Sequence, residues 1–337
     1  MRIAIVTDAW HPQPNGVVRV LSSLYDRLIK GGHEVMVVSP DQFKTIPCPS
    51  YAEIPLAIGA GPGVSEKLDA FGPDAIHIAT EGPLGWAARR HCLRRGYPFT
   101  TAYHTKFPEY IHARTRLPLN WLYAFVRRFH APSSAVMVPS NSVHDELKAR
   151  NFTNLRPWAH GVDTAVFRPQ GKQAFDFPRP IYLYVGRVTV DKNLPAFLDL
   201  PLEGTKVVVG SGPQRDALIK RYPDAKFIIA NGDQQLSSYF SAGDAFVFPS
   251  RTDTFGLVML EAMASGVPVA AFPVAGPRDV LAKAHPDQLP GILDEDLGRA
   301  AKKALTLNPT HARAYAERFS WGVVVSEFLE FLAPIKV

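Results

Sequence analysis

The sequence contains few cysteines: only Cys48 and Cys92 occur among its 337 residues. Two thiols cannot build a disulfide framework, and their spacing matches no cysteine-based metal site. This scarcity fits a reducing compartment, so we expect a cytoplasmic protein.

Long apolar runs are also lacking, since no stretch of about 18 apolar residues is present, as a transmembrane helix requires. The first ten residues, MRIAIVTDAW, carry one arginine before a short apolar run. A signal peptide would need a longer apolar region and a cleavage site with small residues. We therefore expect this segment to form the first strand of the fold. No GxGxxG motif follows it, which counts against a nicotinamide or flavin dehydrogenase.

The composition describes a basic globular protein. Hydrophobic residues make up 46% and charged residues 20%, and the length accommodates two domains. A formal net charge of +6 favours anionic partners: nucleic acid, phosphate-bearing substrates or an anionic membrane. A mildly basic soluble protein without such a partner is the alternative.

The first half alternates short apolar runs with helical spacing. Val17, Leu21, Leu24 and Leu28 recur at a helical period, and Gly31 and Gly32 follow them. The expected strands are 2–8, 33–40, 74–80, 98–105 and 135–140. Buried strands separated by helices predict a doubly wound parallel sheet, and hence an α/β domain over residues 1–160.

The pattern pauses and then repeats. Residues 161–180 are rich in Pro and Gly and predict a linker. The strands expected after it are 181–187, 205–213, 226–232, 245–250 and 267–272. We expect a second domain over 181–315, and closing helices over 316–337 that pack back toward the first domain. Ligands of such sheets bind outside the carboxyl ends of the strands, so we expect the chemistry in a cleft between the domains.

Three loops of the first domain carry candidate residues. Gly16 begins a helix, where free N–H groups suit a phosphate, although Asn15-Gly16 could be a plain turn. Glu81 precedes another helix, either as a cap or as a ligand contact. His104 follows a strand at the expected cleft and is either structural or functional.

In the second domain, Arg187 and Lys192 follow the first strand and could clamp a diphosphate. Gly210 and Gly212 form a turn suited to close ligand approach, or a plain turn. For Arg187 and Lys192, the alternative to a diphosphate clamp is a solvated basic loop.

Residues 250–266, SRTDTFGLVMLEAMASG, combine two acids with an apolar helix. Thr252 or Thr254 could cap this helix, and Asp253 stands at its entrance. Glu261 falls about two turns later, where a carboxylate among apolar residues needs a partner. That partner is either backbone or a hydroxyl-rich ligand.

These residues resemble a known family. GRVTVDKN, GSGP, PSRTDTFGLVMLEAMASG and GVDTAVFRP are similar to the retaining glycosyltransferases of family 4, which have the GT-B architecture. Members carry an E-x7-E motif, of which the first acid here is Asp253. The DTFG version, with TDAWHPQPNGVVR and TEGPLG, resembles sulfoquinovosyl diacylglycerol synthases and GDP-mannose-dependent α-mannosyltransferases.

The resemblance implies a role for each candidate. Glu261 would bond the ribose, Arg187 and Lys192 the diphosphate, with Gly16 completing that grip. Asp253 would hold the sugar hydroxyls, and His104 would contact the transferred sugar. His104, Arg187, Lys192 and Asp253 are thus the expected catalytic residues. The further expected donor-binding residues are Gly16, Gly212, Asn231, Thr254, Phe255, Gly256, Leu257 and Glu261.

The implied reaction is attack on the same face with retention, assisted by the departing phosphate. Cations and N–H dipoles can stabilise the charge on the leaving group. The triplet Asp294-Glu295-Asp296 has the lettering of a metal site, but its place before LGRAAKKAL predicts a helix cap. We therefore expect neither a metal nor another cofactor.

The acceptor is less clearly encoded. Arg89, Arg90, Arg94 and Arg95 fall on one expected helix. Arg127, Arg128 and Trp121 suit docking to an anionic membrane, or a solvated face over core aromatics. Together with Glu81, they are the expected acceptor or membrane contacts.

We thus expect transfer of a hexose from a UDP-sugar or GDP-mannose to a lipid such as diacylglycerol or a glycolipid, at the inner face of the membrane. A soluble sugar or polysaccharide intermediate is the alternative acceptor. A sugar-nucleotide epimerase and a nucleic-acid-binding protein are disfavoured, because the motifs are those of a transferase and the basic residues match no nucleic-acid motif.

Overall fold

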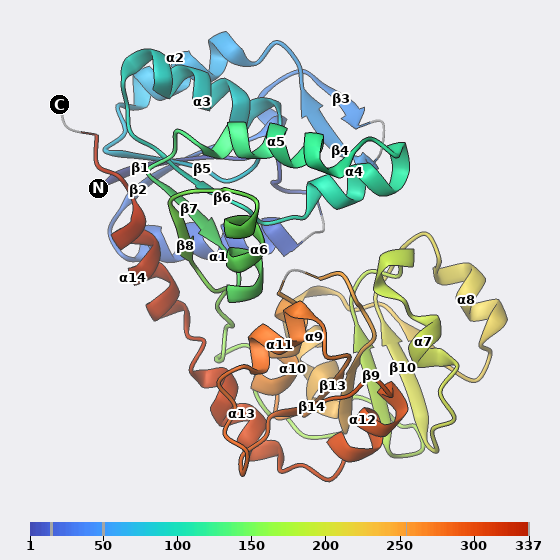
Figure 1. Cartoon of the computed structure of the whole chain (residues 1–337). Coiled ribbons are helices and arrows are strands. Elements are labelled where there is room, and N and C mark those ends of the chain that lie inside the picture. Colours follow the sequence, from blue (N-terminus) through green and yellow to red (C-terminus); the bar gives the residue numbers. More distant parts are fainter. Residues whose placement is uncertain (14–15, 49–50, 254, 336–337) are drawn as a thin grey trace. The chain divides into compact units, whose positions relative to one another are not determined.

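The computed structural model describes residues 1–13, 16–48, 51–253 and 255–335, with all of their side chains except those of 51–54. This part of the chain forms two compact units (Figure 1). The first unit comprises Met1–Ala159 and Gly322–Val337, and the second comprises His160–Trp321. The segment 161–180, expected as a linker, lies inside the second unit.

A six-stranded parallel sheet forms the centre of the first unit, in the order β2-β1-β5-β6-β7-β8. Its strands are β1 (Arg2–Val6), β2 (Glu34–Val38), β5 (Ala75–Ile78), β6 (Thr100–Ala102), β7 (Ala135–Val138) and β8 (Leu155–Pro157). Three of them, β5, β6 and β7, are buried along their whole length. Strands covered on both faces read as short continuous runs rather than alternating ones.

Helices connect these strands. They are α1 (Gly16–Lys30), α2 (Gly61–Phe71), α3 (Pro83–Arg95), α4 (Phe107–Thr115), α5 (Leu119–His130) and α6 (Asn141–Ala149). In α1 the predicted spacing is confirmed, since Leu21, Leu24 and Leu28 are buried. The hydroxyl of Ser140 accepts a hydrogen bond from the Val143 N–H and caps α6.

A short hairpin and a 3-10 helix interrupt the alternation. The helix η1 (Pro40–Gln42) precedes the antiparallel strands β3 (Thr45–Cys48) and β4 (Tyr51–Ala57). The expected strands do not include this hairpin. Pro47 pairs with Pro55, and two prolines in a strand pair remove ladder donors and weaken the strand signal.

The second unit repeats the plan with a six-stranded parallel sheet in the order β11-β10-β9-β12-β13-β14. Its strands are β9 (Ile181–Val185), β10 (Thr205–Val209), β11 (Lys226–Ile228), β12 (Ala245–Phe248), β13 (Val269–Ala271) and β14 (Gly291–Leu293). Its helices are η2 (Val190–Lys192), α7 (Pro195–Leu198), α8 (Arg215–Arg221), α9 (Gly232–Ala242), α10 (Leu257–Ala264), α11 (Ala275–Leu281), α12 (Leu297–Ala304) and α13 (Pro309–Glu317). Both expected doubly wound parallel sheets are therefore confirmed.

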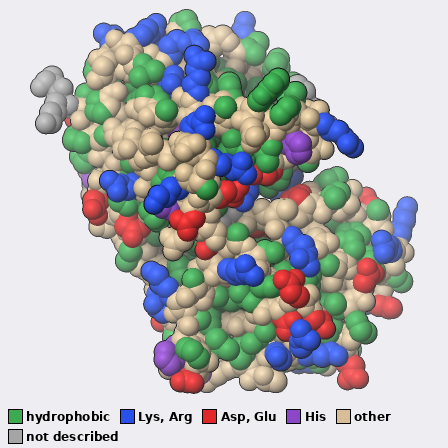
Figure 2. Space-filling model, viewed as in Figure 1, with side chains coloured by type: hydrophobic (Ala, Val, Ile, Leu, Met, Phe, Trp, Pro, Cys, Tyr) green, Lys and Arg blue, Asp and Glu red, His purple; other side chains and the backbone are tan. Residues whose placement is uncertain are grey.

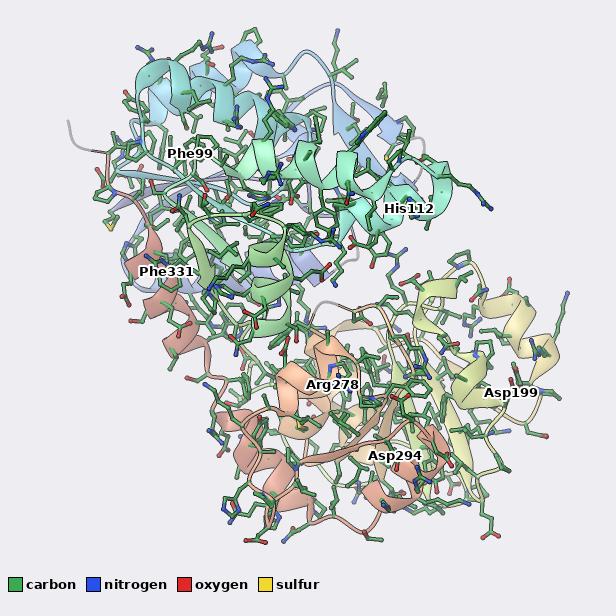
Figure 3. The ribbon with its side chains drawn as sticks, viewed as in Figure 1. Phe99, His112, Asp199, Arg278, Asp294 and Phe331 are labelled. Carbon is green, nitrogen blue, oxygen red and sulfur yellow. The ribbon has the colours of Figure 1, made fainter. Side chains whose placement is uncertain are left out.

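The last helix, α14 (Trp321–Phe331), belongs to the first unit from Gly322 onward. Phe328 is fully buried there, and Phe331 lies near the end of the helix (Figure 3). Beyond α14 the Ile335 N–H donates to the carbonyl of Asp74, at 2.7 Å. The first unit is thus built from residues at both ends of the sequence.

Candidate active site

In the second unit, the loops after β9 and β12 meet because these strands are neighbours in the sheet. Lys192 ends η2 after β9, and Asp253 follows β12. Lys192 Nζ and Asp253 Oδ1 form an ion pair, with side chains that are 20% and 19% exposed. The structure therefore brings Lys192, predicted to bind phosphate, into direct contact with Asp253, predicted to bind the sugar.

The second oxygen of Asp253 is left over. Asp253 Oδ2 is buried and has no hydrogen-bond partner among the described residues. Burying a hydrogen-bond acceptor without a donor costs free energy, and a hydrogen bond from a ligand hydroxyl would offset that cost. This oxygen is suited to binding a sugar hydroxyl.

Asn193 joins the same two loops and is absent from the sequence-based candidates. Its Nδ2 donates to the carbonyl of Pro249, at 3.1 Å, and its backbone is left-handed, with φ of 53°. Asparagine tolerates that conformation better than most residues, so its place after Lys192 is the available sequence signal. Arg187, in the same loop, is exposed.

Gly210 and Gly212 allow two loops of the protein to cross. A Cβ at Gly210 would lie 2.0 Å from the Gly186 oxygen, and one at Gly212 would lie 2.4 Å from the Val188 oxygen. Both have positive φ, at 148° and 154°. The turn explains why β10 ends at Val209 rather than at 213 as expected. Protein packing is enough to require glycine here.

The helix α10 carries the second acid. Glu261 is 4% exposed in a helix whose other buried residues are all apolar. Gly256 precedes the helix with φ of 85°, and no side chain of the described residues caps it. The expected cap at Thr252 is wrong, since its hydroxyl faces the Asp191 carbonyl at 3.5 Å. Thr254 lies outside the described residues.

The remaining donor candidates lie at the edges of this arrangement. Phe255 is buried against His160, with ring centroids 5.3 Å apart, and Leu257 is the first residue of α10. Asn231 stands before α9, and its N–H donates to Gln235 Oε1 at 2.6 Å. Asn231 therefore follows β11, an edge strand of the sheet.

In the first unit, Gly16 and His104 occupy different surroundings. Gly16 begins α1, and a Cβ there would meet no described atom within 4 Å. His104 is 8% exposed, and burial lowers its pKa to about 4. Its ring centroid lies 6.2 Å from that of Trp158. The imidazole is therefore neutral at pH 7.

Asp8 is a buried carboxylate that sequence reasoning missed. It accepts hydrogen bonds from the Leu84 N–H at 2.9 Å and from the Thr80 hydroxyl at 2.8 Å. Burial raises its pKa. Because Asp8 also accepts from the Gly85 N–H at 3.4 Å, its carboxylate rather than that of Glu81 caps the first turn of α3. The position of Asp8 after β1 was the available signal.

Glu81 faces the interior instead. Its side chain is 6% exposed, and its Oε1 lies 3.2 Å from His130 Nε2. Such burial is incompatible with the expected contact to a membrane surface. An acceptor contact stays a prediction.

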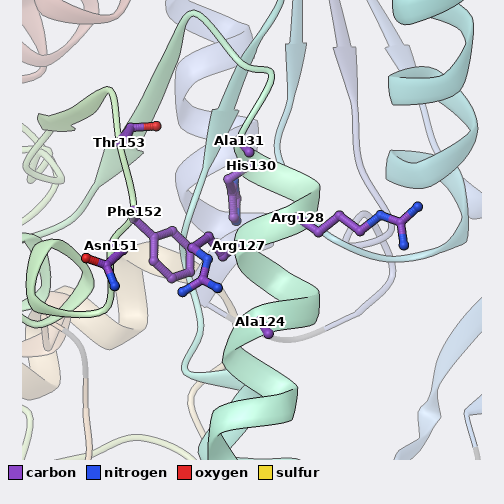
Figure 4. A pocket seen from close by; sticks show the side chains of 8 residues that line it. All are labelled: Ala124, Arg127, Arg128, His130, Ala131, Asn151, Phe152 and Thr153. Carbon is purple, nitrogen blue, oxygen red and sulfur yellow. The ribbon is translucent and has the colours of Figure 1, made fainter.

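The three other acceptor candidates diverge on α5. Trp121 is 71% exposed. Arg127 Nη1 donates to the Arg150 carbonyl at 2.8 Å, beside a cavity of about 310 Å³. Figure 4 shows Arg127 directed toward Asn151, whereas Arg128 points away from it.

The expected cap at the acidic triplet is present. Asp296 accepts a hydrogen bond from the Arg299 N–H at the start of α12, and the Arg299 side chain lowers the pKa of Asp294 to about 2. No cluster of three or more potential His, Cys, Asp or Glu metal ligands occurs in the described ranges. Likewise, none of the described helices has the length and hydropathy of a membrane span.

Two family descriptions match the chain in succession. Glycosyltransferase Family 4 matches residues 14–166, and Glycosyl transferases group 1 matches residues 179–307. These segments together cover most of both units.

Several characterised proteins are similar over most of the chain. The GDP-mannose-dependent alpha-mannosyltransferase of Mycolicibacterium smegmatis is 29% identical, over 98% of this chain and 96% of its own. Alpha-monoglucosyldiacylglycerol synthase of Streptococcus pneumoniae is 28% identical, over 92% and 79%. The sulfoquinovosyl transferase of Arabidopsis thaliana is 29% identical, over 83% of this chain but only 61% of its own length.

Solved structures show the same fold. Sucrose-phosphate synthase from Thermosynechococcus elongatus superposes with a TM-score of 0.73 at 21% identity, covering 98% and 97% of the two chains. Anabaena HepE in complex with UDP and glucose gives 0.72 at 16% identity, covering 98% of each. With this GT-B fold and the two tandem matches, the chain belongs to the glycosyltransferases of family 4.

Proposed function

We propose that this glycosyltransferase moves a hexose from a nucleoside-diphosphate sugar to a lipid acceptor with retention, forming an α-glycosidic bond. The observation that carries the donor half is the arrangement around α10. Asp253 presents an unsatisfied buried oxygen and is held by Lys192, and the buried carboxylate of Glu261 lies on the adjoining helix. These groups match sugar hydroxyls, phosphate oxygens and ribose hydroxyls respectively.

Each residue has a distinct part in this proposal. Lys192 and Arg187 neutralise the diphosphate, where negative charge grows as the glycosidic bond to phosphate breaks. Asp253 and the backbone of Phe255 and Gly256 hold the sugar, and Glu261 holds the ribose. A Cβ at Gly16 would meet no described atom within 4 Å, which is compatible with the approach of a phosphate to this helix N-terminus.

The proposed reaction balances between donor and acceptor alone. The acceptor hydroxyl attacks the anomeric carbon on the face from which the nucleoside diphosphate leaves. A phosphate oxygen of the leaving group takes the proton of that hydroxyl, so the products are the α-glycoside and the nucleoside diphosphate. His104, neutral because it is buried, donates or accepts a hydrogen bond at the transferred sugar.

The lipid half of the proposal has two supports. Alpha-monoglucosyldiacylglycerol synthase is among the similar proteins, and its name gives a glucosylated diacylglycerol as its product. In the structure, α3 contains four arginines and α5 two, and neither contains an acidic residue. Arg89 links the helices by donating to the Phe129 carbonyl at 2.9 Å, and the Trp86 and Phe125 ring centroids lie 5.1 Å apart.

These two helices form a basic surface with exposed aromatics, the α3–α5 face. Trp121 and Phe125 are 71% and 55% exposed on it. Figure 2 shows Lys and Arg side chains among hydrophobic ones over this part of the first unit. Such a surface suits an anionic membrane that presents a lipid acceptor.

A donor screen tests the proposal. Purified protein is incubated with UDP-glucose, UDP-galactose and GDP-mannose, with dioleoylglycerol in mixed micelles, in the presence and absence of EDTA. We expect one donor to yield a glycosylated lipid by mass spectrometry, with equal rates in both conditions. Product only with soluble sugars as acceptors would replace the lipid half, and failure to bind any of the three donors by calorimetry would overturn the donor half.

A further inference from the structure

Four rings from separate segments lie in a row inside the first unit, in edge-to-face or tilted contact. His104 lies after β6, Trp158 after β8, Phe328 in α14 and His77 in β5. Ring centroids are 6.2 Å apart for His104 and Trp158, 5.6 Å for Trp158 and Phe328, and 5.1 Å for Phe328 and His77. Trp158 is 1% exposed, and Phe328 and His77 are fully buried. The predicted catalytic histidine is therefore the outermost ring of an enclosed row.

The helix α14 holds this row at its middle. Trp158 Nε1 donates to the Val324 carbonyl at 2.9 Å, which orients the indole against both neighbours. A buried indole N–H needs such a partner, so its rotamer is fixed by the helix. The far end of the segment is anchored where the Ile335 N–H donates to the Asp74 carbonyl.

The row also fixes its inner end. His77 Nδ1 lies 2.9 Å from the Thr100 hydroxyl, and Thr100 is in β6, the strand that leads to His104. Both imidazoles have pKa values lowered by burial, to about 3 for His77 and about 4 for His104.

We propose that α14 is a positioning element for the reaction: Phe328 and Trp158 set the orientation of the His104 imidazole toward the transferred sugar. This inference rests on the proposed role of His104. It assigns to the last helix of the chain a part in catalysis that acts through Trp158 and His104. Catalytic geometry is sensitive to such support, because a displacement of about 1 Å can cost roughly 100-fold in rate.

The test uses paired variants of the ring row. Phe328→Leu removes one ring from the row but keeps an apolar side chain, and Trp158→Phe keeps a ring but removes the N–H donor. Val323→Ala, on α14 at 53% exposure, is the matched control. In the full chain, turnover is measured with UDP-glucose and GDP-mannose, and UDP and GDP affinities by calorimetry. We expect kcat to fall at least about 10-fold in both ring-row variants, with nucleotide affinities unchanged.

A double-mutant cycle separates positioning from general damage. If Phe328 acts through His104, Phe328→Leu should change kcat less than about 2-fold in a His104→Ala background. An equal loss in both backgrounds would overturn the inference and show that the ring only supports the fold. If His104→Ala itself leaves kcat unchanged, the proposed role of His104 fails instead.

A spectroscopic readout does not depend on turnover. Long-range ¹H–¹⁵N spectra report the His104 ring, assigned by its loss in His104→Ala. Phe328→Leu should shift these signals, whereas Val323→Ala should not. Unmoved His104 signals in both ring-row variants would overturn the inference even if no donor were turned over.

Discussion

At the scale of single residues, Asp253 and Glu261 have different surroundings and hence different expected functions. Asp253 shares its charge with Lys192 and has a spare oxygen, whereas Glu261 is 4% exposed within an apolar helix. An Asp in place of the first Glu of E-x7-E reaches about one methylene less far. The ion pair with Lys192 holds the shorter carboxylate of Asp253 in one position.

Substituting the two acids should affect different measurements. Glu261→Ala should weaken UDP or GDP binding by roughly 10- to 100-fold, since hydrogen bonds to a charged group contribute about 1.5–3 kcal/mol. Asp253→Ala should lower kcat with little change in nucleotide affinity. Glu295→Ala, at 71% side-chain exposure in the same unit, is the control. Wild-type binding and transfer in both variants would refute the assignment.

His77 makes stability depend on pH. Because burial lowers its pKa to about 3, the unfolded chain protonates first as the pH falls. Stability should therefore decrease below pH 6.5 and level off only near pH 3. Between pH 7 and pH 5, His77 accounts for a loss of about 2 kcal/mol.

His77→Asn should remove this loss while keeping a polar atom near Thr100. Urea unfolding at pH 7 and pH 5 measures the difference between the two free energies of unfolding. His285→Asn, at 68% side-chain exposure, is the control. An unaltered pH dependence in His77→Asn would contradict burial of this imidazole as the cause.

At the scale of elements, α3 and α5 act together as one surface. Arg127 is held by the Arg150 carbonyl, whereas Arg128 is exposed and points away from that turn (Figure 4). The two neighbouring arginines therefore differ in their freedom to meet a membrane. Arg128 and the exposed Trp121 are the better-placed contacts.

Binding to vesicles should follow this difference. Arg128→Ala and Trp121→Ala should each weaken co-sedimentation with phosphatidylglycerol-containing vesicles by about 5-fold, since one arginine near such a surface contributes about 1 kcal/mol. Arg221→Ala, 61% exposed in the second unit, should have no effect. Equal binding by all variants, or by neutral phosphatidylcholine vesicles, would remove the membrane proposal.

The element scale also shows where sequence patterns reach their limit. The helix at Leu257–Ala264 is predictable, because its apolar run and flanking glycines are local signals. The β3–β4 hairpin is not, since its paired prolines weaken the strand pattern. The cap of α3 comes from Asp8, 76 positions before Leu84, which no local pattern reveals.

At the scale of the whole molecule, the chain is not divided as its order suggests. The first unit includes Gly322–Val337, so most of the last helix lies in the same unit as the first strand. Phe328 and Trp158, separated by half the chain, are packed in one row. Changes at the C-terminus are therefore changes to the unit that carries His104.

Short stretches of the sequence are enough to predict the two parallel sheets, because buried strands, helical spacing and turn residues are local signals. They also suggest which loop residues bind the donor. The ion pair of Lys192 with Asp253, the burial of Glu81 against His130 and the link from His104 to α14 through Trp158 are visible only in the folded chain. Those contacts join residues distant along the chain, and the closing of the backbone rather than any local preference brings them together.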